Sequence, residues 1–339
     1  MANHFKHPNP RMVVTRTPLR VSFAGGGTDL AEFYESGYGA VLSTAISKYI
    51  YVMVKQHGEV FNERIRLNYS KSERVQHVGE IKNHIARECL RFMEIDPPIY
   101  IDTVGDLPAS TGLGGSSSFA VGLLNALHAY RGERVSAGQL AEEASYIEID
   151  VLKEPIGKQD QYAAAFGGLN LFCFKPGGSV TVEPQRLPNG MLSALFDSIM
   201  MFWTGHQRDT RLVLTEQRAN IAQKMDFLLK MRQHAYQLQE LLSNGDCDPQ
   251  AFGRILDEGW RLKRQLASTI TTDQIDNWYR MGRETGAAGG KLCGAGGGGF
   301  LLFVVPQACQ EAVRQAMYPL KEVSVGPEVH GSQILFVEG

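Results

Sequence analysis

Three glycine-rich turns and one short polar segment carry the residues most able to do chemistry. The turns lie at residues 25–27, 112–115 and 294–299, and the polar segment at 157–161 holds the carboxylate of Asp160. Glycines let main-chain N–H groups approach an anion, because no Cβ atom stands in the way. Phosphoryl transfer needs such a cradle, an oxygen ligand for Mg²⁺ and a carboxylate near the acceptor hydroxyl. The combination indicates a phosphate-bearing ligand.

The central turn has the clearest setting. Residues 108–122 read PASTGLGGSSSFAVG, after an alternating segment at 99–104 and before apolar residues at helical spacing at 119–130. This order predicts a strand, a loop and a helix start, where unpaired N–H donors and serine hydroxyls suit a phosphate. Taken alone, the stretch is explained equally well as a flexible glycine and serine loop capped by a serine.

The sequence does not match better known motifs of this kind, because the neighbouring residues differ from what those motifs require. Gly294, Gly296 and Gly299 have the spacing of a dinucleotide-binding fingerprint, but a β-rich apolar run follows where that fingerprint opens a helix. Gly290 and Lys291 precede a leucine instead of the serine or threonine of a P-loop. No G-x-S-x-G sequence surrounds a serine nucleophile. A Rossmann site, Walker chemistry and an α/β-hydrolase are therefore disfavoured.

The composition narrows the class of protein. The 339 residues are enough for about two domains, and 43% of them are hydrophobic, as ordinary globular cores require. Thirty-four basic and 36 acidic residues give a net charge of −2, which predicts neither nucleic-acid nor membrane partners. Five cysteines without C-x-x-C pairs, and no apolar run near 20 residues, predict a cytoplasmic protein. No heptad seam indicates an oligomeric state.

The N-terminal half is predicted to be rich in strands. A strand at residues 12–24, interrupted by Pro18, leads into the first glycine turn, after which Asp29 is free to cap a helix. Further strands are expected at residues 40–46, 49–55 and 64–69, and a helix at 81–93.

A helix opened by Ser136, with Gln139 as its capping partner, is expected to run to about residue 151. Glu148 lies near the end of this helix, where the helix dipole disfavours a carboxylate. Its position therefore invites a partner. A small-residue helix at 162–166 and a strand at 169–174 follow.

The pattern of charged and apolar residues changes near residue 195. Beyond it, charged and apolar positions interleave in a way that predicts helices packed on a sheet. The expected strands are 198–204, 300–305 and 332–337, and the expected helical segments are 209–242, 249–267, 272–284 and 307–318.

In its motifs the chain resembles the GHMP small-molecule kinases, named for galactokinase, homoserine kinase, mevalonate kinase and phosphomevalonate kinase. Three segments carry the resemblance in the family order: PLRVSFAGGGTD at 18–29, PASTGLGGS at 108–116 and KLCGAGGGG at 291–299. The wording GGGTD, with KQDQYAAAFGG at 158–168, is similar to the sugar 1-kinase branch, which includes heptose 7-phosphate kinases and fucose kinases.

The resemblance implies an α+β fold of two domains. The first, over residues 11–195, would have a ribosomal-protein-S5-like fold and bind ATP and the metal. The second, over residues 196–339, would be ferredoxin-like. ATP and the sugar would meet in the cleft between them, with Mg²⁺ as the second cofactor.

The resemblance also assigns site residues. Asp160 matches the catalytic aspartate, as a general base or an orienting group, and Arg20 the basic residue beside it. Ser116 and Glu148 match the Mg²⁺ ligands, with Ser117 as an alternative because the loop departs from the usual G-L-G-S-S-A. ATP binding is implied for Pro108, Ser110, Gly112, Leu113, Gly114, Gly115, Ser116, Ser117, Ser118, Gly294, Gly296 and Gly297, and sugar binding for Gly26, Gly27, Thr28 and Asp29.

These residues also have ordinary structural explanations. Asp160 and Asp29 would serve as helix caps. Glu148 would be a surface carboxylate, and Arg20 one half of a weak surface ion pair.

A phosphorylated sugar needs a second anion site, separate from the one for ATP. Residues 206–211 read HQRDTR, where a strand ends and a helix begins, so Arg208 and Arg211 are expected to bind the sugar phosphate, with Lys158 as a further ligand. A solvated helix start explains the same residues equally well.

The activity that the resemblance implies is ATP-dependent phosphorylation of the anomeric hydroxyl of D-glycero-D-manno-heptose 7-phosphate to the 1,7-bisphosphate. This would be a step toward a nucleotide-activated heptose for lipopolysaccharide or capsule, with a small sugar phosphate as the binding partner. The alternatives are a fucose or other free-sugar 1-kinase and a non-catalytic sensor of sugar and ATP. The presence of the four catalytic and metal residues argues against the sensor.

Overall fold

Two long strands organise the molecule. β1 (Met12–Ala24) and β2 (Gly39–Gln56) run antiparallel over almost their whole lengths in the computed structural model, which describes residues 11–206, 210–245 and 248–339. Pro18 does not interrupt β1, contrary to the prediction, but only shifts its register with β2. A proline is tolerated there because the irregular register asks for no ladder donor. The strands expected at 40–46 and 49–55 are both parts of β2.

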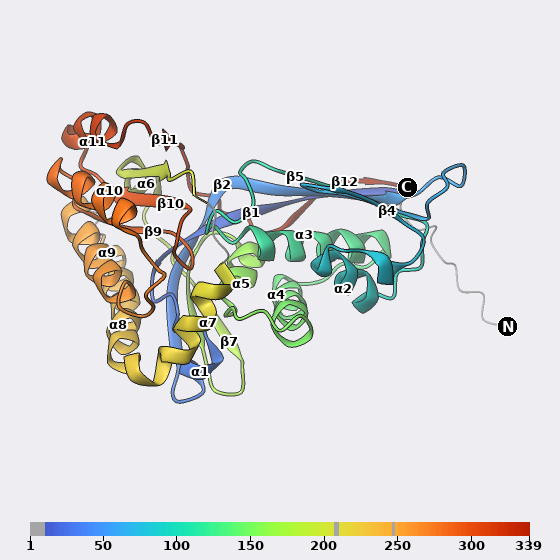
Figure 1. Ribbon diagram of the computed structural model, residues 1–339, viewed down its shortest axis with the longest axis horizontal. Coiled ribbons are helices and arrows are strands. Elements are labelled where there is room, and N and C mark those ends of the chain that lie inside the picture. Colours follow the sequence, from blue (N-terminus) through green and yellow to red (C-terminus); the bar gives the residue numbers. More distant parts are fainter. Residues whose placement is uncertain (1–10, 207–209, 246–247) are drawn as a thin grey trace.

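In the first sheet, the two ends of β2 pair with different strands. β5 (Ile99–Gly105) pairs with one end of β2 and β6 (Leu169–Phe174) with the other. β12 (Gln333–Glu338) pairs only with residues 12–16 of β1, so the end of the chain returns to the first sheet (Figure 1). The remaining strands of this sheet are β3 (Ile65–Asn68), β4 (Ser72–Val75) and β7 (Val180–Pro184).

Beyond the end of β12, the outer edge of β1 pairs with no other described strand. Residues 19–24 of this edge are therefore open to loops from elsewhere in the chain, and the candidate site is built there. The domain boundary expected near residue 195 stays a prediction. β12 lies after that boundary in the sequence but belongs to the first sheet.

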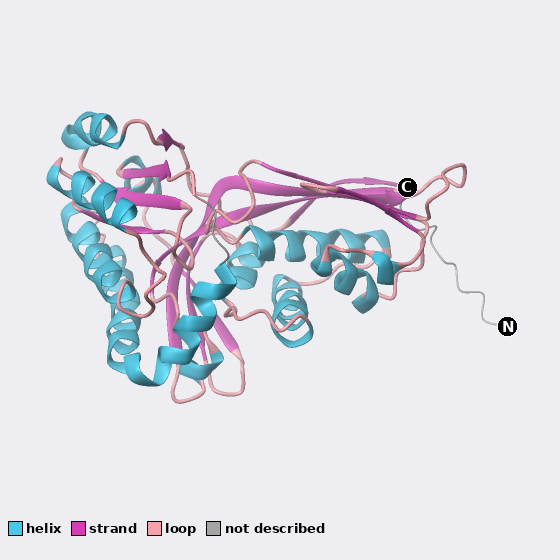
Figure 2. Ribbon diagram, in the orientation of Figure 1, coloured by secondary structure: helices cyan, strands magenta, loops and turns pink. Residues whose placement is uncertain are grey.

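Helices cover one face of the first sheet (Figure 2). α3 (Gly115–Tyr130) packs on both β1 and β2 and is buried on nearly all sides, because its residues are small or apolar. Beside it lie α2 (His84–Phe92), α4 (Ala137–Ser145) and α5 (Gln159–Phe166). The short helices α1 (Ala31–Tyr34) and α6 (Met191–Asp197) lie elsewhere, with 3₁₀ turns at Val78–Glu80, Ile221–Lys224 and Gln307–Cys309.

The helix that Ser136 opens is shorter than predicted. Ser136 Oγ accepts a hydrogen bond from Gln139 N, so the predicted cap is confirmed. The α-helical part ends at Ser145, and a π-helix (Tyr146–Val151) carries the chain onward. Such wider turns are frequent at functional sites because they re-aim side chains. Here the π-helix carries Glu148.

The second sheet has the order β11-β8-β10-β9, with all neighbours antiparallel. This order, with helices between the strands, is the ferredoxin-like arrangement, and the expectation of an α+β fold with two domains is confirmed. Its strands are β8 (Ile199–Trp203), β9 (Gly289–Leu292), β10 (Phe300–Val304) and β11 (Lys321–Glu322). Its helices are α7 (Thr210–Asn220), α8 (Met225–Ser243), α9 (Pro249–Lys263), α10 (Asp273–Glu284) and α11 (Gln310–Met317).

The two sheets are joined through α8 and α9, which pack on β1 or β2 (Figure 1). Phe23 of β1 meets Phe252 of α9 edge to face, with ring centroids 5.1 Å apart. This aromatic contact fixes the two helices over the open edge of β1. None of the described helices has the length and hydrophobicity needed to cross a membrane.

Candidate active site

The central glycine-rich turn lies directly against the third one. Gly112 and Gly294 have φ angles of 79° and 72°. A Cβ atom at Gly112 would lie 2.5 Å from the carbonyl oxygen of Cys293, and one at Gly294 would lie 2.4 Å from Cα of Gly112. Both the left-handed backbone and the close approach require glycine. The two turns therefore form one continuous wall of main chain.

The central turn is anchored to the open edge of β1. Leu113 is fully buried, and its carbonyl accepts a hydrogen bond from Arg20 N at 3.1 Å. Gly114 has a φ of 77°, and a Cβ there would come within 3.2 Å of the Arg20 side chain. Gly115 is the first residue of α3, so its N–H is one of the unpaired donors at the helix start.

The remaining residues expected to bind ATP lie around this wall. Pro108 and Ser110 are exposed on the loop that enters the turn. Gly297 N donates to the carbonyl oxygen of Ile270 at 2.8 Å, and Gly296 packs on the same residue. The structure therefore places Gly296 and Gly297 against the segment before α10 rather than against α3.

Two of the three serines at the start of α3 bond the same carboxylate. Ser116 Oγ donates to Glu148 Oε1 at 2.6 Å, and Ser117 Oγ donates to Oε2 at 2.7 Å. Gln161 Nε2 also donates to Oε2, at 2.6 Å. Ser116 is exposed and Ser117 buried, whereas Ser118 bonds a main-chain carbonyl of β1. The exposed hydroxyl of Ser116 is the one that a ligand from solvent reaches.

Glu148 is fully buried, so its explanation as a surface carboxylate is wrong. Burial raises its pKa to about 7, and the nearby charge of Asp160 acts in the same direction, while the three hydrogen bonds lower it. None of the described lysines, arginines or histidines pairs with this buried carboxylate, so a cation there would stabilise it. Its neighbour Ser116 adds a second oxygen ligand.

This pair of oxygen donors fits Mg²⁺. The ion takes oxygen ligands and keeps several of its waters, so one carboxylate and one hydroxyl beside a nucleotide phosphate are enough protein ligands. Larger metal-binding clusters, with three or more His, Cys, Asp or Glu side chains, do not occur among the described residues.

Arg20 and Asp160 form a two-pronged ion pair. Arg20 Nε donates to Asp160 Oδ1 and Nη2 donates to Oδ2, each at 2.7 Å, while Nη1 donates to the carbonyl oxygen of Gly112 at 2.8 Å. Arg20 is only 4% exposed, so the pair is not the weak surface ion pair considered above. The guanidinium therefore ties Asp160 to the glycine wall in one orientation.

Asp29 is buried in the first glycine turn. Its Oδ1 accepts from Gly27 N at 2.9 Å and its Oδ2 from Gln159 N at 3.4 Å. The helix-cap explanation is wrong for both aspartates, because Leu30 precedes α1 and Lys158 precedes α5, each without a side-chain cap bond. Burial, and then the charge of Asp160, raise the pKa of Asp29.

The two glycines and the threonine beside Asp29 have different roles. Gly26 and Gly27 line the same pocket as Asp29. Thr28 is fully buried, and its hydroxyl bonds the main chain of Gly25 and Ala40. The threonine therefore holds the turn on β2, and its role in sugar binding stays a prediction.

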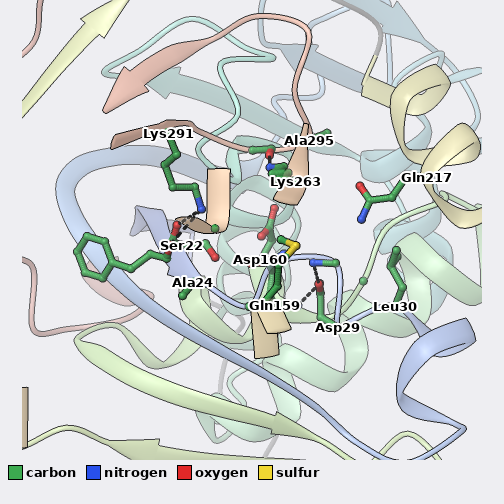
Figure 3. A pocket seen from close by; sticks show the side chains of 18 of the residues that line it. Ser22, Ala24, Asp29, Leu30, Gln159, Asp160, Gln217, Lys263, Lys291 and Ala295 are labelled. Atoms are coloured by element: carbon green, nitrogen blue, oxygen red, sulfur yellow. Dashed lines mark hydrogen bonds between the residues drawn. The ribbon is translucent and has the colours of Figure 1, made fainter. Parts of the chain in front are cut away.

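A pocket lies between the open edge of β1 and helices α8 and α9. Arg20, Asp160 and Asp29 all line it. Asp29 and Asp160 are labelled in Figure 3. Of the eight buried side-chain polar atoms without a partner among the described residues, four belong to residues that line this pocket: Ser22 Oγ, Gln159 Oε1, His234 Nδ1 and Trp260 Nε1. Buried polar atoms are normally hydrogen-bonded, so these four call for a polar ligand or water.

Sequence reasoning missed the far wall of this pocket. Gln217 of α7, His234 of α8, and Trp260 and Lys263 of α9 all line it, as does Lys291 of β9. The first four lie in ordinary amphipathic helices, where nothing in their spacing separates a pocket residue from a core residue. Lys291 opens the third glycine motif, and its place there was the one available signal.

Two of the three residues expected to bind a sugar phosphate, Lys158 and Arg211, are not brought into this pocket. Lys158 Nζ lies 3.1 Å from Glu142 Oε2 and donates to the carbonyl of Gly178, while Arg211 Nε lies 3.0 Å from Glu154 Oε2. Neither is among the residues that line the pocket. Arg208 lies outside the described residues. Sugar-phosphate binding by these three residues stays a prediction.

Two family models match the chain. The model of the GHMP kinases N terminal domain matches residues 76–168, and the model of the GHMP kinases C terminal domain matches residues 238–320. The first match contains the central glycine-rich turn, Glu148 and Asp160, and the second contains the third glycine-rich turn.

Sequence and structure comparisons agree with these models. D-glycero-alpha-D-manno-heptose 7-phosphate kinase of Campylobacter jejuni is 29% identical over 309 residues, which cover 87% of this chain and 90% of that protein. The bifunctional fucokinase/GDP-fucose pyrophosphorylase of Arabidopsis thaliana is 24% identical over 90% of this chain, which spans 31% of that longer protein.

A solved structure is similar over nearly the whole fold. It is described as a D-glycero-D-manno-heptose 1-phosphate kinase from Bacteroides thetaiotaomicron, with a TM-score of 0.78 and 25% identity. The match covers 96% of this chain and all of that one.

Proposed function

The chain belongs to the GHMP kinase family and is an ATP-dependent phosphotransferase that acts on a sugar; we propose that its acceptor is the anomeric hydroxyl of D-glycero-D-manno-heptose 7-phosphate. The product would be the 1,7-bisphosphate. The observation that carries the proposal is the pocket in which Asp160, held by Arg20, shares one space with four unpartnered polar atoms.

The chemistry follows from the position of Asp160. Both of its oxygens are bonded by Arg20, yet its side chain is 24% exposed and faces the pocket, so an acceptor hydroxyl can reach it. The guanidinium fixes the orientation of the carboxylate, which accepts the hydroxyl proton or orients the hydroxyl toward the phosphoryl group. In a loose phosphoryl-transfer transition state, placement contributes more than proton removal. Arg20 also offsets negative charge that develops beside it.

The glycine wall and the start of α3 suit the phosphates of ATP. Main-chain N–H groups of Gly114 and Gly115 and the positive end of the helix dipole favour an anion at this point. Ser116 and Glu148 would hold Mg²⁺, which neutralises phosphate charge when it is bound. The buried carboxylate of Glu148 then gains the cation that it lacks.

The sugar belongs on the other side of Asp160. Asp29 and the unpartnered atoms of Ser22, His234 and Trp260 offer donors and acceptors to several hydroxyl groups. A polyhydroxylated acceptor satisfies them, whereas a mostly apolar acceptor leaves them unpaired at a cost. The choice of a heptose phosphate rests on the names of the Campylobacter and Bacteroides proteins, which place the phosphate at different carbons.

An assay of ADP release tests the proposal. Purified protein with Mg²⁺ and ATP is offered heptose 7-phosphate, heptose 1-phosphate, mannose 6-phosphate, L-fucose, galactose and mevalonate, and ³¹P NMR locates the new phosphate. Turnover confined to heptose 7-phosphate, with a new signal at C1, supports the proposal. Turnover only on L-fucose or another free sugar contradicts it in favour of the free-sugar kinase, which the Arabidopsis relative represents. Sugar and ATP binding without turnover favours a sensor.

We also propose a cytoplasmic location and a role in supplying a nucleotide-activated heptose for lipopolysaccharide or capsule; the role depends on the same assay.

A further inference from the structure

Two lysines enter the sugar pocket from the second sheet and its helices. Lys263 is the last residue of α9 and Lys291 belongs to β9, and both line the pocket (Figure 3). Lys263 is 7% exposed and Lys291 is 8% exposed. Lysine is almost never buried to this degree unless it is paired with an opposite charge.

The partners of both ammonium groups are neutral. Lys291 Nζ donates to the carbonyl oxygens of Ser22 at 2.7 Å and Phe23 at 3.2 Å, on the open edge of β1. Lys263 Nζ donates to the carbonyl oxygen of Gly294. Neither lysine takes part in an ion pair with any described residue. Buried Arg20, by contrast, has the carboxylate of Asp160.

Burial without an ionic partner therefore disfavours the charged form of both lysines. It lowers the pKa of Lys263 to about 7 and that of Lys291 to about 8, and the charge of Arg20 contributes to both shifts. Isolated buried ions are costly, and a protein keeps them where a ligand supplies the opposite charge.

The position of the lysines says which anion they face. Residues 108–118, which include the main-chain cradle at the start of α3, do not line the pocket, whereas both lysines, Asp29 and Asp160 do, together with Gly294 of the third glycine-rich turn. Both ammonium groups thus share one pocket with the two aspartates that face the acceptor. The expected alternatives on that side, Lys158 and Arg211, already face Glu142 and Glu154.

We propose that Lys263 and Lys291 form a subsite for the phosphate monoester of the sugar acceptor. The proposal rests on the proposed function, because it takes the acceptor to be a sugar phosphate. It moves the second anion site from residues 206–211 to the junction of α9 and β9. The two ammonium groups would donate hydrogen bonds to the phosphate, while the carbonyl oxygens of Ser22 and Phe23 on the edge of β1 keep Lys291 in place.

Steady-state kinetics of Lys263→Met and Lys291→Met test the subsite. Methionine keeps an unbranched apolar chain and removes the charge. The matched control is Lys230→Met, at an exposed lysine on α8. For each variant, KM and kcat are measured with heptose 7-phosphate, with the same heptose lacking phosphate, and with ATP as the varied substrate. Inorganic phosphate is tested as an inhibitor against each substrate.

Each buried-lysine variant is expected to raise KM for the phosphosugar about 10- to 100-fold, the usual effect of losing a hydrogen bond to a charged group. The KM for ATP and kcat/KM for the free heptose should stay within about threefold of wild type, and the control should behave as wild type on all substrates. In the wild type, inorganic phosphate should compete with the sugar and not with ATP.

Four outcomes would overturn the subsite, and the first three leave the proposed function intact. A raised KM for ATP places the lysines on the transferred phosphoryl group, and equal losses on both sugars make them structural. Unchanged kinetics on the phosphosugar mean that the two lysines bind no substrate anion. In each of these three cases, turnover of heptose 7-phosphate by the wild type leaves the proposed function intact. A wild-type enzyme that phosphorylates only free sugars defeats the proposed function and the subsite together.

Discussion

Replacing Asp160 by asparagine removes the carboxylate at the centre of the pocket with little change in size. Both carboxylate oxygens accept bonds of 2.7 Å from Arg20, one from Nε and one from Nη2. An amide has one acceptor oxygen and one NH₂ group, so the NH₂ must face an arginine N–H or turn away. Asp160→Asn therefore loses one of the two bonds as well as the negative charge.

The size of the effect depends on the role of Asp160. Loss of a general base lowers kcat about 10²- to 10⁴-fold, which corresponds to about 3 to 5 kcal/mol of barrier. An orienting group would cost less, because the amide oxygen still accepts a hydrogen bond. Loss of one charge-assisted bond costs about 1.5–3 kcal/mol of folding stability where the pair is buried. The 24% exposure of the Asp160 side chain brings the expected value to the lower end of that range.

The assay compares kcat, KM for each substrate and Tm for wild type, Asp160→Asn and Asp150→Asn. Asp150 is an exposed aspartate on the π-helix, so its variant controls for the loss of one negative charge nearby. We expect kcat to fall at least 10²-fold in Asp160→Asn, with a small fall in Tm, and neither to change in the control. A folded Asp160→Asn enzyme that keeps kcat within about threefold of wild type would refute a necessary proton transfer to Asp160.

Three further predictions concern the loops, the metal ligand and pH. Gly112→Ala should lower both Tm and the affinity for ATP, because its Cβ would lie 2.5 Å from a main-chain carbonyl oxygen. The control is Gly132→Ala, which has a φ of 77° but open space around its Cβ, so it measures the backbone strain alone, about 1 kcal/mol. Equal losses in the two variants would mean that the close packing of the turns is unimportant. Ser116→Ala should raise the Mg²⁺ concentration required for half-maximal rate about tenfold or more, whereas Ser117→Ala, at a buried hydroxyl, should mainly lower Tm; the reverse result would assign the metal to Ser117. Burial, and then the charges of its neighbours, lower the pKa of Lys263 to about 7. Between about pH 7 and 10 the unfolded chain therefore binds more protons than the folded one. For this reason Lys263 makes the free energy of unfolding rise with pH across that range. Lys263→Met should flatten that rise in urea unfolding of the ligand-free protein, and an unchanged slope would contradict the buried charge.

The parts of this protein that the sequence alone determined are those with local requirements. A left-handed glycine, a serine cap or an alternating strand is specified within a few residues, so the glycine turns and the cap at Ser136 were predictable. The order of three motifs then led to the kinase family. Local reasoning failed where neighbours outside the segment decided the outcome, as at Asp29, which bonds Gln159 instead of capping α1.

Only the tertiary structure decided which side chains share the pocket. His234, Trp260 and Lys263 sit at ordinary positions of amphipathic helices, and the sequence period that buries a residue does not say whether it faces a core or a ligand. The short β12 leaves one edge of β1 open, and α8 and α9 close over it from the second sheet. Burial of charge is likewise a property of the assembled fold, because desolvation depends on atoms distant in sequence. That is why the burial of Lys263 and Lys291, and the lowered pKa of each, could not be read from the sequence, although Lys291 lies in the third glycine motif.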